Sequence, residues 1–283
     1  MGLINYNIEK YSPQQLVVIP LVLFAISLVV IAFTMLATGM PVTPGIDFSG
    51  GTAVTIITTD SSAQLQTTFA GYPLSEISDM NNGKFLKFGT MDDAKYQSLT
   101  QLISQKYPDA KIDQIGESFG KSLQSQAALA LLISFIGMAI VVFLSFRTFI
   151  PSVAVVLSAL ADMVMTAAMM NIIGIPLSLG TTAALLMLIG YSVDSDILLT
   201  NRVLKRQGKL NDKLMGAFHT GIIMTSTTLA ATTALFVVSW FGSVQILMEI
   251  SAVLLIGLVA DILNTWLTNV GILKWYVLKG GGK

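Results

Sequence analysis

The 283-residue chain is 53% hydrophobic and only 11% charged, with a mean hydropathy of +0.73. A soluble domain carries about a quarter charged residues because its surface faces water, so this composition excludes an ordinary soluble protein. The 16 basic and 16 acidic residues leave no net charge, which argues against nucleic acid as a partner. The absence of cysteine excludes disulfides, thiolate metal sites and a cysteine nucleophile. We expect no metal and no cofactor.

Six apolar runs are each long enough to cross a bilayer, which takes about 20 helical residues. We predict transmembrane helices at Leu16–Thr38, Ser122–Phe146, Ile150–Asn171, Leu177–Thr200, Ala217–Trp240 and Val244–Tyr276. These runs divide the chain into an N-terminal segment (1–15), the first helix (16–38), a polar domain (39–121), a five-helix bundle (122–276) and a tail (277–283). The first helix lacks a small-residue cleavage site, so we expect it to be retained.

The positive charges predict the orientation of these helices. Cations lie in the loop at Arg147, in the loop from Arg202 to Lys213 and in the tail, while the loops at 171–176 and 241–243 carry none. By the positive-inside rule both termini are cytoplasmic, and the polar domain is external to the cytoplasmic membrane.

The polar domain has the element order of a ferredoxin-like fold. Strands are predicted at Thr52–Thr58, Leu74–Ser78, Lys84–Gly89 and Lys111–Gly116, and helices at Ala63–Ala70 and from Asp92 and Asp93 to Lys106. This β-α-β-β-α-β order gives one small α+β core. The fold class is therefore a polytopic α-helical membrane protein of six transmembrane helices with a small external domain between the first two.

Ionisable residues inside the membrane are the candidate working residues, because an acid near the bilayer centre costs about 2.5 to 3.5 kcal/mol to insert. The candidates are Asp162, Asp194, Asp196, Glu249 and Asp261. Glu249 falls near the outer boundary, where simple solvation explains it. The alternative to proton handling for the others is a structural hydrogen bond to a neighbouring helix.

The depth of each acid separates these candidates further. Asp162 lies about 18 Å from the cytoplasmic side, and Asp194 and Asp261 both lie about 25 Å from the outer face. We therefore expect Asp194 and Asp261 to approach each other and to share a proton. Asp196 is about 200° from Asp194 around the helix, and we expect it at the interface. The only histidine, His219, is a further proton-coupling candidate or a surface residue.

Two motifs carry a resemblance to a known family. Gly45-Ile-Asp-Phe-Ser-Gly-Gly51 follows the first helix, and Ile189-Gly-Tyr-Ser-Val-Asp194 precedes Arg202. With one helix, an external domain and five more helices, the chain resembles the SecF family of protein-export membrane proteins, and its ending resembles the archaeal branch. The motif residues are Gly45, Asp47, Phe48, Gly50, Gly51, Gly190, Tyr191, Ser192 and Arg202. The pair Gly50-Gly51 is either a tight turn or a hinge.

The resemblance implies membership of the resistance-nodulation-division superfamily. It implies SecD as a partner, action on a translocating preprotein beside the Sec protein-conducting channel, contact with membrane lipid and use of the proton gradient. Bacterial members carry Asn-Asp after Gly-Tyr-Ser-Val, where this chain has Asp194-Ser195-Asp196. They also carry an arginine near the start of the fifth helix, where this chain has His219 or Thr220-Gly221.

Two other functions remain open on the sequence. A half-transporter of the same superfamily would export lipid or small amphiphiles, but residues 39–121 are few for its usual docking domain. An intramembrane aspartyl protease would use two acids at matched depth as a catalytic pair. Otherwise no enzymatic activity is expected.

Overall fold

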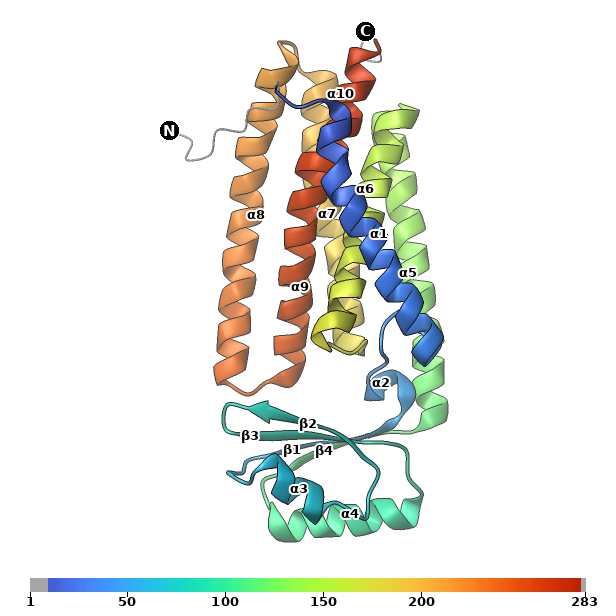
Figure 1. Ribbon diagram of the computed structural model, residues 1–283, viewed down its shortest axis with the longest axis vertical. Helices are drawn as coiled ribbons and strands as arrows, with labels where there is room; N and C mark the ends of the chain where they lie inside the picture. The colour runs from blue at the N-terminus through green and yellow to red at the C-terminus, as the bar shows by residue number, and fades with distance from the viewer. Residues whose placement is uncertain (1–9, 281–283) are drawn as a thin grey trace.

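Six long apolar helices form a bundle in the computed structural model, which describes residues 10–280 (Figure 1). The first five are α1 (Pro13–Thr38), α5 (Glu117–Phe146), α6 (Phe149–Ile173), α7 (Leu179–Lys205) and α8 (Leu210–Phe241). The sixth is continuous but divided into α9 (Gln245–Leu263), the π-helical turn η1 (Asn264–Asn269) and α10 (Val270–Leu278). Each of the six is long and apolar enough to span a membrane. The fold class expected from the sequence is confirmed.

Residues 1–9 of the predicted N-terminal segment and 281–283 of the predicted tail lie outside the described residues. The described chain differs from the prediction in the last run, Val244–Tyr276. It was expected to be one α-helix, and the structure inserts the π-helical turn Asn264–Asn269. Hydropathy does not reveal such a turn, because it reports how apolar a segment is and not its hydrogen-bond spacing.

The bundle has a protein-buried centre and a periphery. Half of the most apolar 18-residue stretch of α6 and 56% of that of α7 are buried, against 11% to 17% for α1, α5 and α8. The run containing α9 is intermediate, at 39%. Polar side chains are costly where a helix faces hydrocarbon, so the inward faces of α6, α7 and α9 are where this chain tolerates them.

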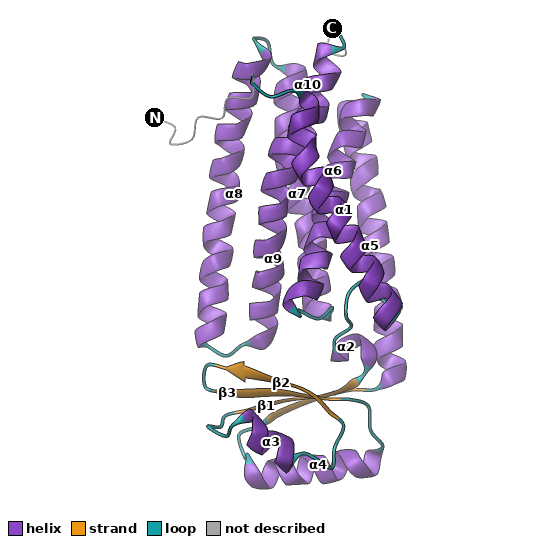
Figure 2. Ribbon diagram, in the orientation of Figure 1, coloured by secondary structure: helices purple, strands orange, loops and turns teal. Residues whose placement is uncertain are grey.

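The small domain lies at one end of the bundle and has the predicted β-α-β-β-α-β order (Figure 2). Its elements are β1 (Gly51–Ile56), α3 (Ser62–Thr68), β2 (Leu74–Met80), β3 (Gly83–Phe88), α4 (Asp93–Lys106) and β4 (Lys111–Ile115). The antiparallel sheet has the order β2-β3-β1-β4. Helices α3 and α4 cover the sheet face that is turned away from the bundle. Their buried core includes Leu65, Phe69, Leu86, Phe88 and Leu99.

Local signals in the sequence set the ends of the domain helices. The Ser61 side chain accepts a hydrogen bond from the Gln64 N–H and starts α3, and the Asp92 side chain accepts one from the Lys95 N–H and starts α4. Both are N-cap bonds, which satisfy backbone donors that the first helical turn leaves unpaired. These bonds give both helix starts a local physical cause in the sequence.

Gly51 opens β1 with a φ of 133°. A Cβ atom at this position would lie 2.4 Å from the carbonyl oxygen of Phe88 on the paired strand. Glycine is needed here both for its backbone conformation and for the close approach of β3.

We predict that Gly51→Ala destabilises the small domain by about 3 kcal/mol, since it adds backbone strain to a backbone clash. Gly71→Ala is the matched control, because a Cβ there has no atom within 4 Å and φ is not positive. Hydrogen exchange of the full-length protein, followed in peptides from β1 and β3, should show faster exchange for Gly51→Ala alone. Equal exchange in the two variants would contradict the steric requirement.

Candidate functional site: a buried carboxylate network

Three aspartates from three different helices are buried in the centre of the bundle. Asp162 of α6 and Asp196 of α7 are fully buried, and Asp261 of α9 is 2% exposed. The three carboxylates lie close enough to influence one another electrostatically.

Asp162 is held by two neighbouring helical segments. The hydroxyl of Ser192 on α7 donates to Asp162 Oδ2 at 2.5 Å, and the Nδ2 of Asn264 on η1 donates to Asp162 Oδ1 at 2.7 Å. Both donors are buried. Each carboxylate oxygen of Asp162 therefore has its own donor, and the side chain ties α6 to both α7 and η1.

Asp196 and Asp261 are joined through hydroxyl groups. Ser195 Oγ lies 3.0 and 3.1 Å from the two oxygens of Asp261. Thr265 Oγ1 lies 2.9 Å from Asp196 Oδ1 and 3.0 Å from Asp261 Oδ1. A hydroxyl carries one hydrogen, so Thr265 donates to one carboxylate at a time. The second contact becomes a hydrogen bond when the facing carboxyl group carries a proton and donates it.

The π-helical turn supplies the amides of this network. Asn269 Nδ2 donates to Asp196 Oδ1 at 2.7 Å, just as Asn264 donates to Asp162. The two asparagines are five residues apart. In an α-helix that spacing separates side chains by about 140°, but a π-helical turn closes on i→i+5 bonds and brings the two towards one face. The turn thereby directs both amides towards carboxylates on α6 and α7.

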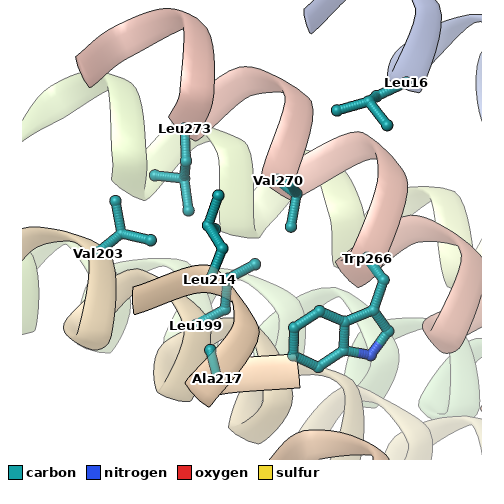
Figure 3. Packing of buried hydrophobic residues seen from close by; sticks show 8 residues of the cluster. All are labelled: Leu16, Leu199, Val203, Leu214, Ala217, Trp266, Val270 and Leu273. Carbon is teal, nitrogen blue, oxygen red and sulfur yellow. The ribbon is translucent and has the colours of Figure 1, made fainter. Parts of the chain in front are cut away.

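Apolar packing fixes the position of this turn (Figure 3). Trp266 of η1 lies beside Ala217 of α8, in a buried cluster that also contains Leu16, Leu199, Val203, Leu214, Val270 and Leu273. Trp266 is 2% exposed and its ring meets that of Phe218 edge to face at a centroid distance of 5.1 Å. The cluster draws on α1, α7, α8, η1 and α10. Side chains on one face of η1 are thus anchored while its other face presents the two asparagines.

No basic side chain compensates these acids in the part of the chain from residue 10 to residue 280. The three ion pairs found there are Lys84 with Asp79, Lys87 with Glu76 and Lys121 with Glu117, and none involves the buried aspartates. Burying an uncompensated carboxylate is far more costly than burying a neutral carboxyl group. A carboxyl group in such a site can take up or release a proton, and this is the chemistry that the arrangement allows.

The first motif forms the joint between the bundle and the small domain. It folds into the short helix α2 (Ile46–Ser49), which Figure 1 places between the two parts. Asp47 Oδ2 accepts a hydrogen bond of 2.7 Å from the Leu179 N–H at the start of α7. The Gly45 N–H donates to the Leu177 oxygen at 2.8 Å, and Phe48 is buried in the bundle core. The motif thus attaches the domain to the N-terminal end of the helix that carries Ser192, Ser195 and Asp196.

Comparison with known proteins gives the family. The description "Protein export membrane protein SecD/SecF, C-terminal" matches residues 95–279. The chain is 57% identical to a protein-export membrane protein SecF of Methanolacinia petrolearia over 99% of this chain and all of that protein. It is 42% identical to a SecF of Haloferax volcanii over 96% of this chain and 95% of that protein. The chain belongs to the SecF family.

A solved structure has the same fold. It is that of "SecDF, a translocon-associated membrane protein" from Thermus, which matches with a TM-score of 0.73 and 22% sequence identity. The match covers 94% of this chain and 38% of that longer chain. This SecF-family chain therefore corresponds to less than half of the length of that SecDF chain.

The second SecF motif divides between the network and the bundle surface. Ser192 is buried and binds Asp162, but Gly190, Tyr191 and Asp194 are exposed. Asp194 lines a pocket of about 590 Å³ with Asn201, Arg202 and residues of the following loop. Arg202 Nη2 donates to Thr220 Oγ1 of α8 at 2.8 Å. Ser192 is thus the member of this motif that contacts a buried acid.

Two expectations about the acids are wrong in their geometry. Asp194 does not face Asp261, and Asp196 does not lie at the interface; the two have exchanged places. The predicted angle of about 200° between them is the reason, since turning one inwards turns the other outwards.

His219 lies on the exposed side of α8 and not beside the acids. Asp196 and Asp261 share the Thr265 hydroxyl and are buried, so neither is presented to a peptide bond as a protease would require.

Several residues of the site escaped sequence reasoning. They are the buried residues Ser195 and Thr265 and the two asparagines of η1, while Ser192 was predicted only as a motif residue and not as a partner of an acid. The signal available was a pair of asparagines inside an apolar run. Their spacing of five does not fit an α-helical face, so it gave no reason to place both beside the acids.

A cleft that contains a few charged side chains separates the sheet from the helix ends. Two adjoining pockets of about 510 and 440 Å³ are both lined by Lys87 of β3 and Glu249 of α9. Lys87 Nζ donates to Glu76 Oε2 at 2.7 Å. Burial acts to raise the pKa of the Glu76 carboxyl, but hydrogen bonds from Lys87 and Ser78 outweigh it and hold the pKa below its usual value. Glu249, which was expected at the outer boundary, faces this cleft.

Close packing of α7 against α9 brings Ser195 to Asp261, and Gly257 permits that packing. A Cβ atom at Gly257 would lie 2.4 Å from Cδ2 of Leu188, which is fully buried. We predict that Gly257→Ala destabilises the bundle by about 1 to 3 kcal/mol through overpacking. In a Leu188→Ala background the same change should cost almost nothing, because the clashing methyl groups are gone.

Thermal unfolding of the four proteins of this cycle in detergent measures the coupling. Gly137→Ala on α5 is the control, because its Cβ would have no atom within 4 Å. Equal costs of Gly257→Ala in the two backgrounds would show that Leu188 does not set the separation of α7 and α9.

Proposed function

We propose that this chain is the SecF subunit of a SecD–SecF complex that assists protein translocation across the cytoplasmic membrane, driven by the proton gradient. Its partners are SecD, the Sec protein-conducting channel and the translocating preprotein. The observation that carries the proton-coupling part is the network of three buried aspartates, which has no basic partner in the described part of the chain. Family membership and the SecDF fold support the export part.

The proposed orientation places both termini in the cytoplasm and the ferredoxin-like domain outside the cell membrane. The cations of the loops distant from the domain support it. With this orientation, Asp196 lies nine residues from the cytoplasmic end of α7, about 14 Å along the helix. It lies about 26 Å from the external end of the same helix. Protons arriving from outside therefore cross most of the bundle before they reach it.

Helix α7 is the mechanical link in this proposal. It carries Asp196, Ser192 and Ser195 in its second half, and its first residue is bound by Asp47 of the domain joint. When a carboxylate in the network takes up a proton, the direction of its hydrogen bonds changes and so does the preferred packing of α6, α7 and α9. A rigid helix transmits such a shift to its far end, where the domain is attached. The proposed output is a movement of the domain that acts on the emerging chain.

The peripheral helices are suited to contact SecD and lipid. α1, α5 and α8 expose large apolar side chains such as Phe33, Leu36, Leu144 and Val238. The exposed apolar surface of a bundle in a bilayer needs either lipid or a second apolar helix bundle beside it. The additional length of the matched SecDF chain supports the second for part of this surface.

We predict that Asp196→Asn and Asp162→Asn each abolish the gradient-dependent part of export. Both substitutions keep the side-chain size and remove the titratable group. Asp194→Asn is the matched control, since its carboxylate is exposed and outside the network. The measurement is pulse-chase release of a secreted reporter from cells carrying each variant in place of the native subunit, with and without a protonophore.

The level of SecD that co-purifies with each variant separates a coupling defect from an assembly defect. The proposal requires normal SecD recovery and loss of the protonophore-sensitive component for Asp196→Asn and Asp162→Asn only. Full protonophore-sensitive export by these two variants would contradict proton coupling through the network. Loss of that component in Asp194→Asn alone would move the coupling to the exposed acid.

A further inference from the structure

The network leaves four buried oxygen atoms around Asp196 unpaired. They are Asp196 Oδ2, Asn269 Oδ1, Thr200 Oγ1 and Ser158 Oγ, and none has a hydrogen-bond partner within the described part of the chain. All four residues are fully buried. A buried polar atom without a partner costs about 1 to 3 kcal/mol, and native proteins have few of them. One bound molecule that pairs with all four oxygen atoms would remove this cost.

The four atoms belong to one neighbourhood built by three helical segments. Asn269 of η1 is bonded through Nδ2 to the other carboxylate oxygen of Asp196, at 2.7 Å. Thr200 follows Asp196 by one turn on α7 and lies on the same face. Ser158 of α6 lies beside the Asp196 carboxylate and its hydroxyl interacts with it, but no full hydrogen bond pairs Ser158 Oγ with Asp196 Oδ2. The unpaired atoms therefore surround one side of Asp196.

We propose that an ordered water molecule binds here, held by Asp196, Asn269, Thr200 and Ser158. Buried waters typically make about three hydrogen bonds to polar groups that would otherwise be unsatisfied. This site offers two acceptors, Asp196 Oδ2 and Asn269 Oδ1, and two hydroxyl donors. A water donates two hydrogen bonds and accepts two, so one molecule satisfies all four groups.

A sodium ion fits the same oxygens less well. Cation binding uses both hydroxyl oxygens as ligands and turns their hydrogens away from the ion. Those hydrogens would then need acceptors, and neither hydroxyl has one among residues 10–280. A water uses the hydrogens directly. The donor and acceptor count therefore selects water over a metal ion.

The water also has a role in the proposed function, on which this part of the inference rests. It is the group in contact with the free oxygen of Asp196, while Oδ1 is occupied by Thr265 and Asn269. When Oδ2 carries a proton it donates to the water, which then accepts from Oδ2 and from one hydroxyl. The second hydroxyl rotates and accepts a hydrogen from the water, which leaves its own O–H as the one unsatisfied donor, against two with a bound cation. Ser158 and Thr200 are thus positioning residues whose hydroxyl groups reorient as Asp196 changes its charge.

The titratable groups that face Asp196 are Asp261 of α9 and, farther off, Asp162 of α6. Neither offers a positive charge. Hydration of Asp196 therefore adds to the Ser158 hydroxyl in stabilising this side of the carboxylate when it is ionised.

Infrared difference spectroscopy of the full-length protein with SecD, recorded between low and high pH in H₂¹⁶O and in H₂¹⁸O, tests the site. A bound water that changes its hydrogen bonds gives an O–H stretching band that shifts with the oxygen isotope. We expect this band in the native protein and its loss in the double variant Ser158→Ala with Thr200→Val. The matched control is Ser251→Ala with Thr232→Val, because these buried hydroxyls bond to carbonyls of their own helices.

Two results would overturn the proposal. One is an isotope-sensitive band that is unchanged in the Ser158 and Thr200 double variant. The other is a rise in the melting temperature with Na⁺ relative to K⁺ or choline that Asp196→Asn removes, since it would put a cation at this site. The double variant is also expected to lower protonophore-sensitive export severalfold. If the isotope band behaves as expected while Asp196→Asn retains coupled export, the water site stands and the proposed proton coupling fails.

Discussion

The burial of three carboxyl groups with no basic partner among residues 10–280 is the constraint on which the bundle depends. A lipid-facing acid would be expelled towards the interface, so Asp162, Asp196 and Asp261 require α6, α7 and α9 to enclose them. Donors for the acids come from hydroxyl and amide groups, which supply hydrogen bonds but no charge. A lysine or arginine would neutralise an acid permanently. Hydroxyl and amide partners leave the charge of the network to be set by protons.

The same constraint explains the irregular sixth helix. An uninterrupted α-helix from Val244 onwards would direct Asn264 and Asn269 to different sides. The π-helical turn brings them to one side, and its position is held by Trp266 in the apolar cluster behind it. π-helical turns in α-helices occur frequently at functional sites, because the extra residue redirects side chains at a modest cost in helix stability. Here the redirected side chains serve two acids on two helices.

Much of the fold followed from the sequence, and the arrangement of the site did not. Hydropathy and turn chemistry were enough to predict six helices and the β-α-β-β-α-β order, because each depends on local composition and caps such as Ser61 and Asp92. Local composition could not predict which of the two aspartates of α7 points into the bundle. Residues 194 and 196 differ by a rotation about α7, and that rotation is fixed by packing against α6 and α9. Depth along the helix, which the sequence does give, says nothing about which side faces in.

The position of α7 connects the network to the rest of the molecule. One end of this helix receives the Asp47 bond and the backbone contacts of residues 43–45, and its inward face carries Ser192, Ser195 and Asp196. The domain and the acids are therefore attached to one rigid element, 27 residues long. At the domain joint, the tight approach of Gly51 to β3 leaves little freedom at the start of the sheet itself. Any movement passed along α7 would thus displace the small domain as a unit, through the short helix α2, without distorting its strands.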